Sequence, residues 1–329
     1  MKRLAVAGAG AWGTALAEVA ARAGCATCLW VRDSILAETI ARQHENPAYL
    51  PGIRLDPAIT ATSDLGMALA DVDAALIVVP AQFLRGVLIG MADRSRVGLP
   101  LLLCAKGIET ESLQTMSEVA GETVPQSPIA VLSGPSFAAE AARGLPTAVA
   151  IASRDPALSG AFVTALGSAR FRPYSLADLV GVEIGGAVKN VLAIACGIVE
   201  GRGLGDNARA ASITRGLAEM VRLGLAKGAE AETFRGLSGL GDLVLTCTAA
   251  QSRNYALGTA LGRGETLVEA LAGRRSVVEG VATAGALARL AARLHVEMPI
   301  TAAVDAVLHR GMAIDAMIEA LLSRPYRAE

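Results

Sequence analysis

The chain has 329 residues, of which 53% are hydrophobic and 3% aromatic, and its formal net charge is −1. A chain of this length exceeds one ordinary hydrophobic core, so two domains are expected. The balanced charge, without a run of Lys or Arg, excludes the electrostatic surface that nucleic-acid or membrane binding requires. No apolar run reaches the roughly 18 residues of a membrane span. We therefore expect a cytoplasmic protein with neither nucleic acid nor membrane as a partner.

Five cysteines, mostly in apolar runs, predict buried free thiols in a reducing compartment. Cys25 and Cys28 form a C-x-x-C motif with no second pair nearby, which makes a zinc or redox site improbable. We expect no metal.

The first half of the chain alternates short apolar runs with helical segments such as Thr14–Ala23 and Leu113–Ala120. Six runs predict buried parallel strands: Leu4–Ala7, Ala26–Val31, Ala74–Val79, Leu101–Cys104, Ile129–Leu132 and Ala148–Ala152. This alternation indicates an α/β domain over residues 1–180, with the doubly wound parallel sheet of a Rossmann fold.

After Val180 the pattern changes to helical periodicity without a convincing strand. The predicted helices are Gly181–Val199, Ala208–Lys227, Thr266–Ala272, Ala282–Leu294 and Ile314–Leu322. Residues 181–329 are thus expected to form an all-helical second domain.

A G-x-G-x-x-G motif joins the first predicted strand to the first helix. In this motif Gly8 permits the tight turn, Gly10 lets a pyrophosphate approach the backbone, and Gly13 lets helix and strand pack closely. The free N–H groups at the helix N-terminus attract the anion. Because the motif stands in the first βα unit, it predicts a dinucleotide site.

The end of the second strand bears on which dinucleotide is bound. Asp33 lies about 20 residues beyond Gly13, where an acid holds the ribose hydroxyls of NAD. Arg32 instead suits the 2′-phosphate of NADP, and a solvated strand end would explain both residues without a ligand. We favour NADP, with NAD tolerated.

Hydride transfer to a ketone needs a proton donor. The three histidines are expected to be structural, because His44 lies in a Pro-flanked loop and His295 and His309 lie in or near late helical segments without an obvious polar cluster. Lys106 follows a predicted strand at the carboxyl edge of the sheet, where ligands bind. Lys189 interrupts a nearly apolar helix, where desolvation lowers the pKa of a lysine toward the range useful for proton transfer. The alternative is that Lys189 reaches the surface by its long stem.

Two further segments carry polar groups. Asp242 and Thr246 follow a Gly-rich turn at i and i+4 on one helix face, where Asp242 either orients the lysine ammonium or is only a helix N-terminal charge. The run Ser252-Arg253-Asn254 places hydroxyl, guanidinium and amide donors together. It predicts a phosphate cradle, with an ordinary polar loop as the alternative.

At these residues the sequence resembles the bacterial NAD(P)-dependent glycerol-3-phosphate dehydrogenases, over nearly the whole chain. The matching motifs are the start GAGAWGTALA, Asn46-Pro-Ala-Tyr49-Leu-Pro51, Lys106-Gly-Ile, Ser133-Gly-Pro-Ser136-Phe-Ala138, Gly186-Ala-Val-Lys189-Asn190-Val, Ser238-Gly-Leu-Gly-Asp242-Leu, Thr246-Cys-Thr, Ser252-Arg253-Asn254 and Val278-Glu279-Gly280. So many motifs in one order are highly specific.

The resemblance implies reversible reduction of dihydroxyacetone phosphate to sn-glycerol 3-phosphate, the backbone of phospholipids. It implies that Lys189 is the proton donor and acceptor and that Lys106 touches both substrate and cofactor. The implied substrate contacts are Lys106, Gly134, Ser136, Lys189, Asn190, Asp242, Thr246, Ser252, Arg253 and Asn254. The implied cofactor contacts are Gly8, Gly10, Ala11, Trp12, Gly13, Arg32, Lys106, Ala138, Arg253, Val277 and Glu279.

One departure is Ala11, where many relatives have a serine, so one side-chain hydrogen bond to the cofactor is in doubt. Two other functions compete with this assignment. One is a dehydrogenase of the same plan acting on a 3-hydroxy acid or 6-phosphogluconate, against which Asp242 and the Ser-Arg-Asn run argue. The other is a nicotinamide-sensing protein without turnover, which would need no buried acid–base group. A homodimer through the helical domain is also expected.

Overall fold

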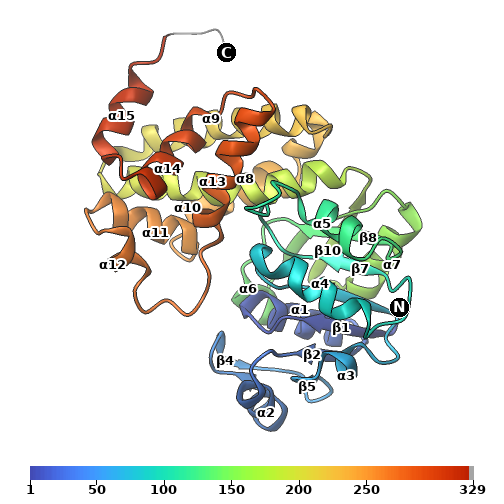
Figure 1. Cartoon of the computed structure of the whole chain (residues 1–329). Coiled ribbons are helices and arrows are strands. Elements are labelled where there is room, and N and C mark those ends of the chain that lie inside the picture. Colours follow the sequence, from blue (N-terminus) through green and yellow to red (C-terminus); the bar gives the residue numbers. More distant parts are fainter. Residues whose placement is uncertain (326–329) are drawn as a thin grey trace. The chain divides into compact units, whose positions relative to one another are not determined.

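The computed structural model describes residues 1–325, which divide into two compact units (Figure 1). The N-terminal unit comprises residues 1–106 and 114–183. The C-terminal unit comprises residues 107–113 and the chain from residue 184 onward. The chain therefore passes between the units at three points, of which one directly follows Lys106.

The N-terminal unit is built on an eight-stranded sheet with the order β10-β9-β8-β7-β6-β1-β2-β5. The strands are β1 (Arg3–Ala7), β2 (Ala26–Trp30), β5 (Thr60–Thr62), β6 (Ala74–Ile77), β7 (Leu101–Leu103), β8 (Ile129–Ser133), β9 (Thr147–Ala152) and β10 (Phe171–Leu176). From β5 through β8 every neighbouring pair is parallel. From β1 the chain builds β2 and β5 on one side, and then returns to form β6 on the other side of β1. This reversal of strand order is the Rossmann arrangement, so the predicted fold class is confirmed.

The predicted parallel orientation of the strand at residues 148–152 was wrong. β9 is antiparallel to β8 and parallel to β10. A parallel return from β8 needs a crossover that runs back along the sheet and is usually a full helix, whereas α6 (Ala138–Ala142), the helix between β8 and β9, has only five residues. A longer helix, α7 (Pro156–Leu166), then connects the parallel pair β9 and β10.

Seven α-helices lie wholly in this unit, and six of them form two groups of three. α1 (Ala11–Arg22) packs against α6 and α7, while α4 (Leu84–Ala92) packs against α3 (Leu65–Leu69) and α5 (Met116–Thr123). The remaining helix, α2 (Ser34–Gln43), contacts β5. α5 begins three residues later than predicted because Thr115 and Glu118 form a capping box that fixes its first turn.

A small antiparallel hairpin, β3 (Glu45–Asn46) and β4 (Leu50–Arg54), was not predicted. Its sequence carries two prolines and little apolar alternation, so it has no strand signal. Leu50 and Ile53 nevertheless bury themselves in a cluster with Ala15 and Ala142. The hairpin is thereby fixed against α1 and α6.

Up to residue 325, eight α-helices carry residues of the C-terminal unit: α8 (Leu179–Gly201), α9 (Gly205–Ala226), α10 (Asp242–Thr248), α11 (Arg253–Gly262), α12 (Leu267–Leu271), α13 (Glu279–Arg293), α14 (Pro299–Arg310) and α15 (Ile314–Leu322). Between residues 184 and 325 the structure contains no strand, as expected. All five helices predicted for this region are present within a few residues, whereas α11 and α14 were not predicted.

α8 is the central helix of this unit and is packed unusually closely. A Cβ on Gly197 would lie 2.1 Å from the carbonyl oxygen of Tyr255, and a Cβ on Gly258 would lie 2.1 Å from that of Ile194. Only glycine permits α8 and α11 to approach backbone to backbone in this way. The approach fixes the start of α11 relative to the residues of α8 that carry chemistry.

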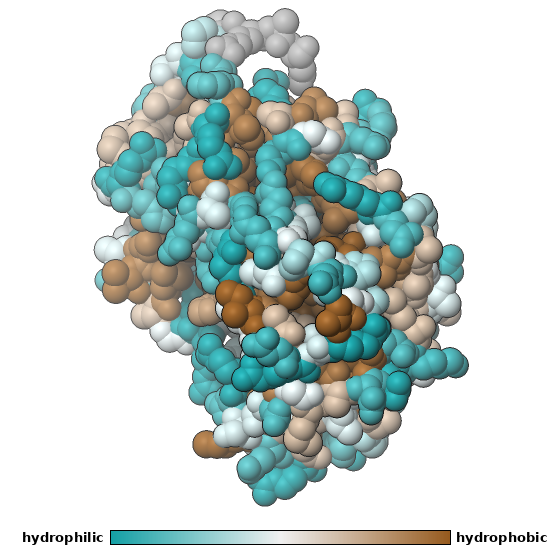
Figure 2. All heavy atoms as spheres, turned by 45° about the vertical axis from the view of Figure 1, so that its right-hand side comes forward, coloured by the Kyte–Doolittle hydropathy of each residue, from teal (hydrophilic) through white to brown (hydrophobic). Residues whose placement is uncertain are grey.

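α8 is also the one helix in the described chain that is long and apolar enough to cross a membrane, but 94% of its most apolar window is buried within the protein. It is therefore explained as a core helix. On the face shown in Figure 2, hydrophobic residues lie in separate groups among hydrophilic ones.

Candidate active site

The Gly-rich turn between β1 and α1 is shaped by close backbone contacts. Gly8 has a φ of +116°, and a Cβ there would lie 2.8 Å from the carbonyl oxygen of Val78. A Cβ on Gly13 would lie 1.8 Å from the carbonyl oxygen of Gly8. Both positions therefore require glycine. At Gly10 a Cβ would meet nothing within 4 Å, so the turn is open on the side where an anion would approach.

The same turn offers donors for a dinucleotide. Gly10 is the N-cap of α1 and makes no side-chain cap, so the first N–H groups of the helix are available to an anion. The indole Nε1 of Trp12 is buried and has no hydrogen-bond partner in the described chain. A buried donor without a partner is costly unless a ligand accepts from it. The residues present thus fit a nicotinamide dinucleotide.

The two residues considered for cofactor choice, Arg32 and Asp33, have different surroundings at the end of β2. Asp33 is the N-cap of α2, and its Oδ1 accepts hydrogen bonds from Ile35 N at 2.9 Å and Leu36 N at 3.1 Å. Arg32 is exposed and has no ion-pair partner within residues 1–325. The aspartate therefore has a structural task that explains it without a ligand, whereas the arginine has none.

Lys106 lies just beyond β7, beside the residues that follow β8. Its Nζ donates to the carbonyl oxygen of Gly134 at 3.1 Å, and Ser136 Oγ donates to the same oxygen at 3.0 Å. Gly134 has a φ of +138° and approaches Val149 closely, so it must be glycine. Ala138 opens α6 two residues after Ser136. Four predicted site residues therefore gather at the carboxyl edge of the sheet.

Lys189 forms a buried ion pair within the C-terminal unit. Its Nζ lies 2.6 Å from Asp242 Oδ1 and donates to Thr246 Oγ1 at 2.9 Å. Lys189 is 7% exposed and Asp242 1% exposed, so the lysine does not reach the surface. Asp242 is also the first residue of α10, where the helix N-terminus favours its negative charge. The two interpretations of Asp242, as a partner of the lysine ammonium and as a helix N-terminal charge, are therefore compatible.

A turn of π-helix over Leu237–Gly241 delivers Asp242 to this position. The turn lies directly against α8, since a Cβ on Gly185 would be 2.4 Å from the carbonyl oxygen of Ser238. The glycine of the turn, Gly239, lies equally close to the backbone of Phe234. The Gly-rich sequence is thus required for the close approach of α10 to Lys189.

Asn190 connects the lysine to α11 and α13. Its Oδ1 accepts a hydrogen bond from Asn254 Nδ2 at 3.0 Å, and Asn254 Oδ1 accepts from Gly280 N at 2.9 Å. Asn254 therefore uses its acceptor and one of its two N–H groups inside the protein. Only one donor of this amide remains for a phosphate.

The N-terminus of α11 presents the remaining donors of the Ser-Arg-Asn run. Ser252 is the N-cap and accepts from Tyr255 N, so its hydroxyl hydrogen is directed elsewhere. Arg253 donates from Nη1 to the carbonyl oxygen of Val277 at 2.8 Å. Desolvation lowers the pKa of the partly exposed Arg253, and the neighbouring Glu279 carboxylate opposes this shift. The segment is therefore the start of a helix and not a loop, and the free N–H groups of a helix N-terminus favour an anion.

The three histidines do not join these clusters. His44 ends α2 with a φ of 48°, His295 has a φ of 55°, and His309 pairs with Asp305 at 2.9 Å. Within residues 1–325 no cluster of three or more His, Cys, Asp or Glu side chains could hold a metal ion. Two buried polar residues near the clusters had not been predicted: Asn46, beside the Gly-rich turn, and Glu183, on α8.

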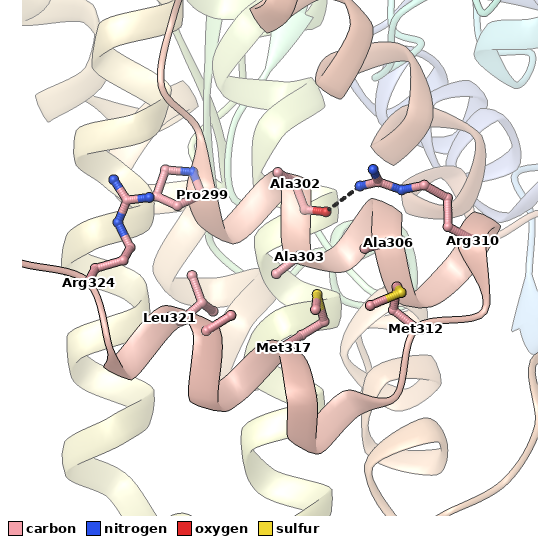
Figure 3. Close-up of a pocket in the computed structure, with 10 residues that line it drawn as sticks. Pro299, Ala302, Ala303, Ala306, Arg310, Met312, Met317, Leu321 and Arg324 are labelled. Carbon is pink, nitrogen blue, oxygen red and sulfur yellow. Dashed lines mark hydrogen bonds between the residues drawn. The ribbon is translucent and has the colours of Figure 1, made fainter.

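A pocket of about 360 Å³ lies between α14 and α15 (Figure 3). Its lining is mostly Ala and Met, and Arg310 on its edge donates to the carbonyl oxygen of Ala302 and pairs with Asp305. None of the predicted site residues lines it. The described residues that line it offer no acid–base group, so it is not the candidate site.

A doubly wound domain with a G-x-G-x-x-G turn, joined to a helical unit with a buried Lys–Asp pair, defines a nicotinamide-dinucleotide-dependent oxidoreductase. Family models for the N-terminal and C-terminal parts of NAD-dependent glycerol-3-phosphate dehydrogenase match residues 3–159 and 178–319. The chain belongs to the NAD-dependent glycerol-3-phosphate dehydrogenase family, as its motifs had indicated.

Individual relatives agree with this assignment. Glycerol-3-phosphate dehydrogenase (NAD(P)+) of Rhodospirillum rubrum is 57% identical, covering 99% of this chain and 93% of the relative. That of Caulobacter vibrioides is 56% identical, covering 100% and 99%. The crystal structure of glycerol-3-phosphate dehydrogenase from Coxiella burnetii is 41% identical, with a TM-score of 0.95 over 98% of this chain and 99% of that chain.

Proposed function

We propose that this chain interconverts dihydroxyacetone phosphate and sn-glycerol 3-phosphate with NAD(P)H, and that Lys189 is the proton donor and acceptor. The observation that carries the proposal is the buried ion pair of Lys189 with Asp242, which also engages Thr246. A buried charge is costly without partners, and a lysine held this firmly in an apolar helix suits directed proton transfer. The names of the relatives supply the substrate.

When bound, the reduced nicotinamide supplies the hydride to the carbonyl carbon. As that bond forms, Lys189 gives a proton from Nζ to the carbonyl oxygen, which becomes the hydroxyl of glycerol 3-phosphate. Asp242 and Thr246 orient the ammonium by accepting its other hydrogens. In the reverse direction neutral Lys189 takes the hydroxyl proton. Solvent restores the proton after each reduction.

The remaining residues bind and orient. The Gly8–Gly13 turn and Trp12 hold the dinucleotide, with Ala11, Ala138, Val277 and Glu279 as further contacts. Arg253, Ser252 and Asn254 take the substrate phosphate at the N-terminus of α11. Lys106 and Asn190 hold the reacting end, with Gly134 and Ser136 beside Lys106. In this proposal residues 1–180, the dinucleotide-binding domain, carry most of the cofactor contacts, and residues 181–329, the substrate domain, carry most of the substrate contacts.

The proposal extends to cofactor preference and setting. NADPH is preferred, because Arg32 is exposed and unpaired in the described chain whereas Asp33 caps α2. The protein acts in the cytoplasm as a homodimer and supplies glycerol 3-phosphate for phospholipid synthesis. Its free cysteines, four of them buried, agree with a reducing compartment.

The test is the loss of reduced-nicotinamide absorbance when the purified chain meets dihydroxyacetone phosphate, with NADPH and NADH in parallel. We expect oxidation of both, faster with NADPH, and none above background in Lys189→Met. Binding of NADPH without any oxidation would remove the substrate assignment and support a sensing protein. If the keto form of a 3-hydroxy acid oxidises NADPH and dihydroxyacetone phosphate does not, the result would favour the related dehydrogenases.

A further inference from the structure

Asn46 is a fully buried polar residue outside the predicted site, and every polar group of its side chain is used. Its Nδ2 donates to the carbonyl oxygen of Ala9 at 2.9 Å and to Thr14 Oγ1 at 2.8 Å. Its Oδ1 accepts from Tyr49 N at 3.1 Å. Asn46 is 0% exposed. A buried amide satisfied at both ends specifies one geometry for its partners.

Its two acceptors lie on opposite sides of the Gly-rich turn. Ala9 stands between Gly8 and Gly10, on the way into the turn, and Thr14 lies in the first turn of α1, on the way out. A single Asn46 amide nitrogen thus bridges both limbs. The bridge holds the Ala9 carbonyl toward Asn46 and so away from any anion bound by the N–H groups of the turn.

The hairpin that carries Asn46 is itself firmly placed. Gly52 N donates to Glu45 Oε1 at 2.8 Å, and Leu55 N donates to the carbonyl oxygen of His44 at 2.7 Å, which closes the hairpin. Leu50 and Ile53 bury against α1 and α6, and the cluster they form also contacts Trp12 and Ala138. The hairpin therefore braces two of the proposed cofactor contacts as well as the turn.

We propose that Asn46 is a positioning residue for the dinucleotide: it clamps Ala9 to Thr14 so that the N–H groups of the Gly-rich turn converge on the pyrophosphate. The inference rests on dinucleotide binding in the proposed function. Asn46 touches no substrate and performs no proton transfer. Its loss changes affinity for the cofactor and leaves the chemical step and the affinity for the ketone substrate largely intact.

The experiment measures NADPH dissociation constants by fluorescence of the reduced nicotinamide, together with the steady-state constants and the melting temperature. Asn46→Ala is expected to raise the dissociation constant about tenfold, the loss that one buried hydrogen bond brings. The KM for dihydroxyacetone phosphate should stay within about twofold, a range that corresponds to under 1 kcal/mol. Thr14→Val, which keeps the shape and removes the hydroxyl, should weaken NADPH binding in the same direction.

Ile53→Ala is the matched control, because it loosens the packing of the same hairpin and leaves the Asn46 amide in place. If it weakens NADPH binding as much as Asn46→Ala at an equal loss of melting temperature, the role of Asn46 is only structural and the inference is wrong. If Asn46→Ala does not fold, Thr14→Val decides, and unchanged NADPH binding in that variant overturns the clamp. A wild-type chain that binds no NADPH would refute the proposed function instead.

Discussion

The carboxylate of Glu183 on α8 accepts both donors of Ser117 on α5, with Oε1 2.7 Å from Ser117 N and Oε2 2.6 Å from Ser117 Oγ. Glu183 is 5% exposed, and burial raises the pKa of this carboxyl to about 7 although the hydrogen bonds from Ser117 lower it. The two residues join the start of α8, the helix that carries Lys189, to the N-terminus of α5.

This pair predicts a pH dependence of stability. A carboxyl whose pKa is higher in the folded state binds its proton more tightly there, so its contribution to the unfolding free energy is full below the unfolded pKa, about 4.3. The contribution is lost as pH rises through about 7. Glu183→Gln is permanently neutral. The unfolding free energy of the wild type minus that of Glu183→Gln should therefore fall between about pH 4.3 and about pH 7, by about 1.4 kcal/mol per pH unit at most, and level off at higher pH.

Chemical denaturation at several pH values measures this difference. Glu122→Gln, also on α5, serves as a comparison because its half-exposed carboxylate pairs with Arg85 and lies outside this buried contact. Parallel curves for the wild type and Glu183→Gln across the range would show that Glu183 titrates near its ordinary pKa.

The ion pair of Lys189 and Asp242 predicts that a double variant can regain stability without regaining activity. Lys189→Met removes the proton donor, and kcat should fall about 10²- to 10⁴-fold. It also removes the positive charge that compensates the buried Asp242 carboxylate, which destabilises the fold by about 3 kcal/mol. The double variant Lys189→Met with Asp242→Asn should regain most of that stability and remain inactive. Substantial kcat in either variant would exclude Lys189 from the chemistry.

The Ser-Arg-Asn run predicts specific recognition of the phosphate. Arg253→Ala should raise the KM for dihydroxyacetone phosphate about 30-fold, equivalent to about 2 kcal/mol for a charge-assisted contact. At saturating NADPH the slow reduction of unphosphorylated dihydroxyacetone should be unaffected, because that substrate lacks the anion. Arg263→Ala, at the other end of α11, is the control and should leave both unchanged. An equal effect on the two substrates would place Arg253 away from the phosphate.

The central part of the fold was predictable because its parallel strands are buried on both faces and stand out as continuous apolar runs, as at Leu101–Leu103. The edge strands β5 and β10 were missed for the opposite reason, since solvent exposure allows polar residues such as Thr60 and Arg172. The direction of β9 leaves no local mark in the sequence at all, because strand direction is decided by which neighbour the chain returns to.

The residues of the candidate site likewise divide into those that the sequence could reveal and those that it could not. Lys189 and Asp242 could be singled out from the sequence because a charge in an apolar helix and a carboxylate after a Gly-rich turn are both locally unusual. Asn46 could not, because its importance lies in hydrogen bonds to Ala9 and Thr14, more than thirty positions earlier in the chain. The motif that begins at Asn46 contributed to the family resemblance, but nothing local in the sequence indicates which residues this asparagine contacts.

Arg32 and Asp33 are adjacent at the end of β2, and we expect one to determine cofactor choice and the other the stability of α2. Arg32→Ala should lower the ratio of kcat/KM for NADPH to that for NADH about tenfold, the loss of a charge-assisted contact to the 2′-phosphate. It should leave stability unchanged, because Arg32 is exposed and pairs with nothing else in the described chain. Asp33→Ala should do the reverse, costing about 1 kcal/mol of unfolding free energy through the lost cap of α2 while the cofactor ratio stays constant. Steady-state assays with both cofactors and denaturation of both variants decide the matter. A large fall in NADH efficiency in Asp33→Ala, with Arg32→Ala unaffected, would mean that the aspartate holds the ribose and that NAD is the preferred cofactor.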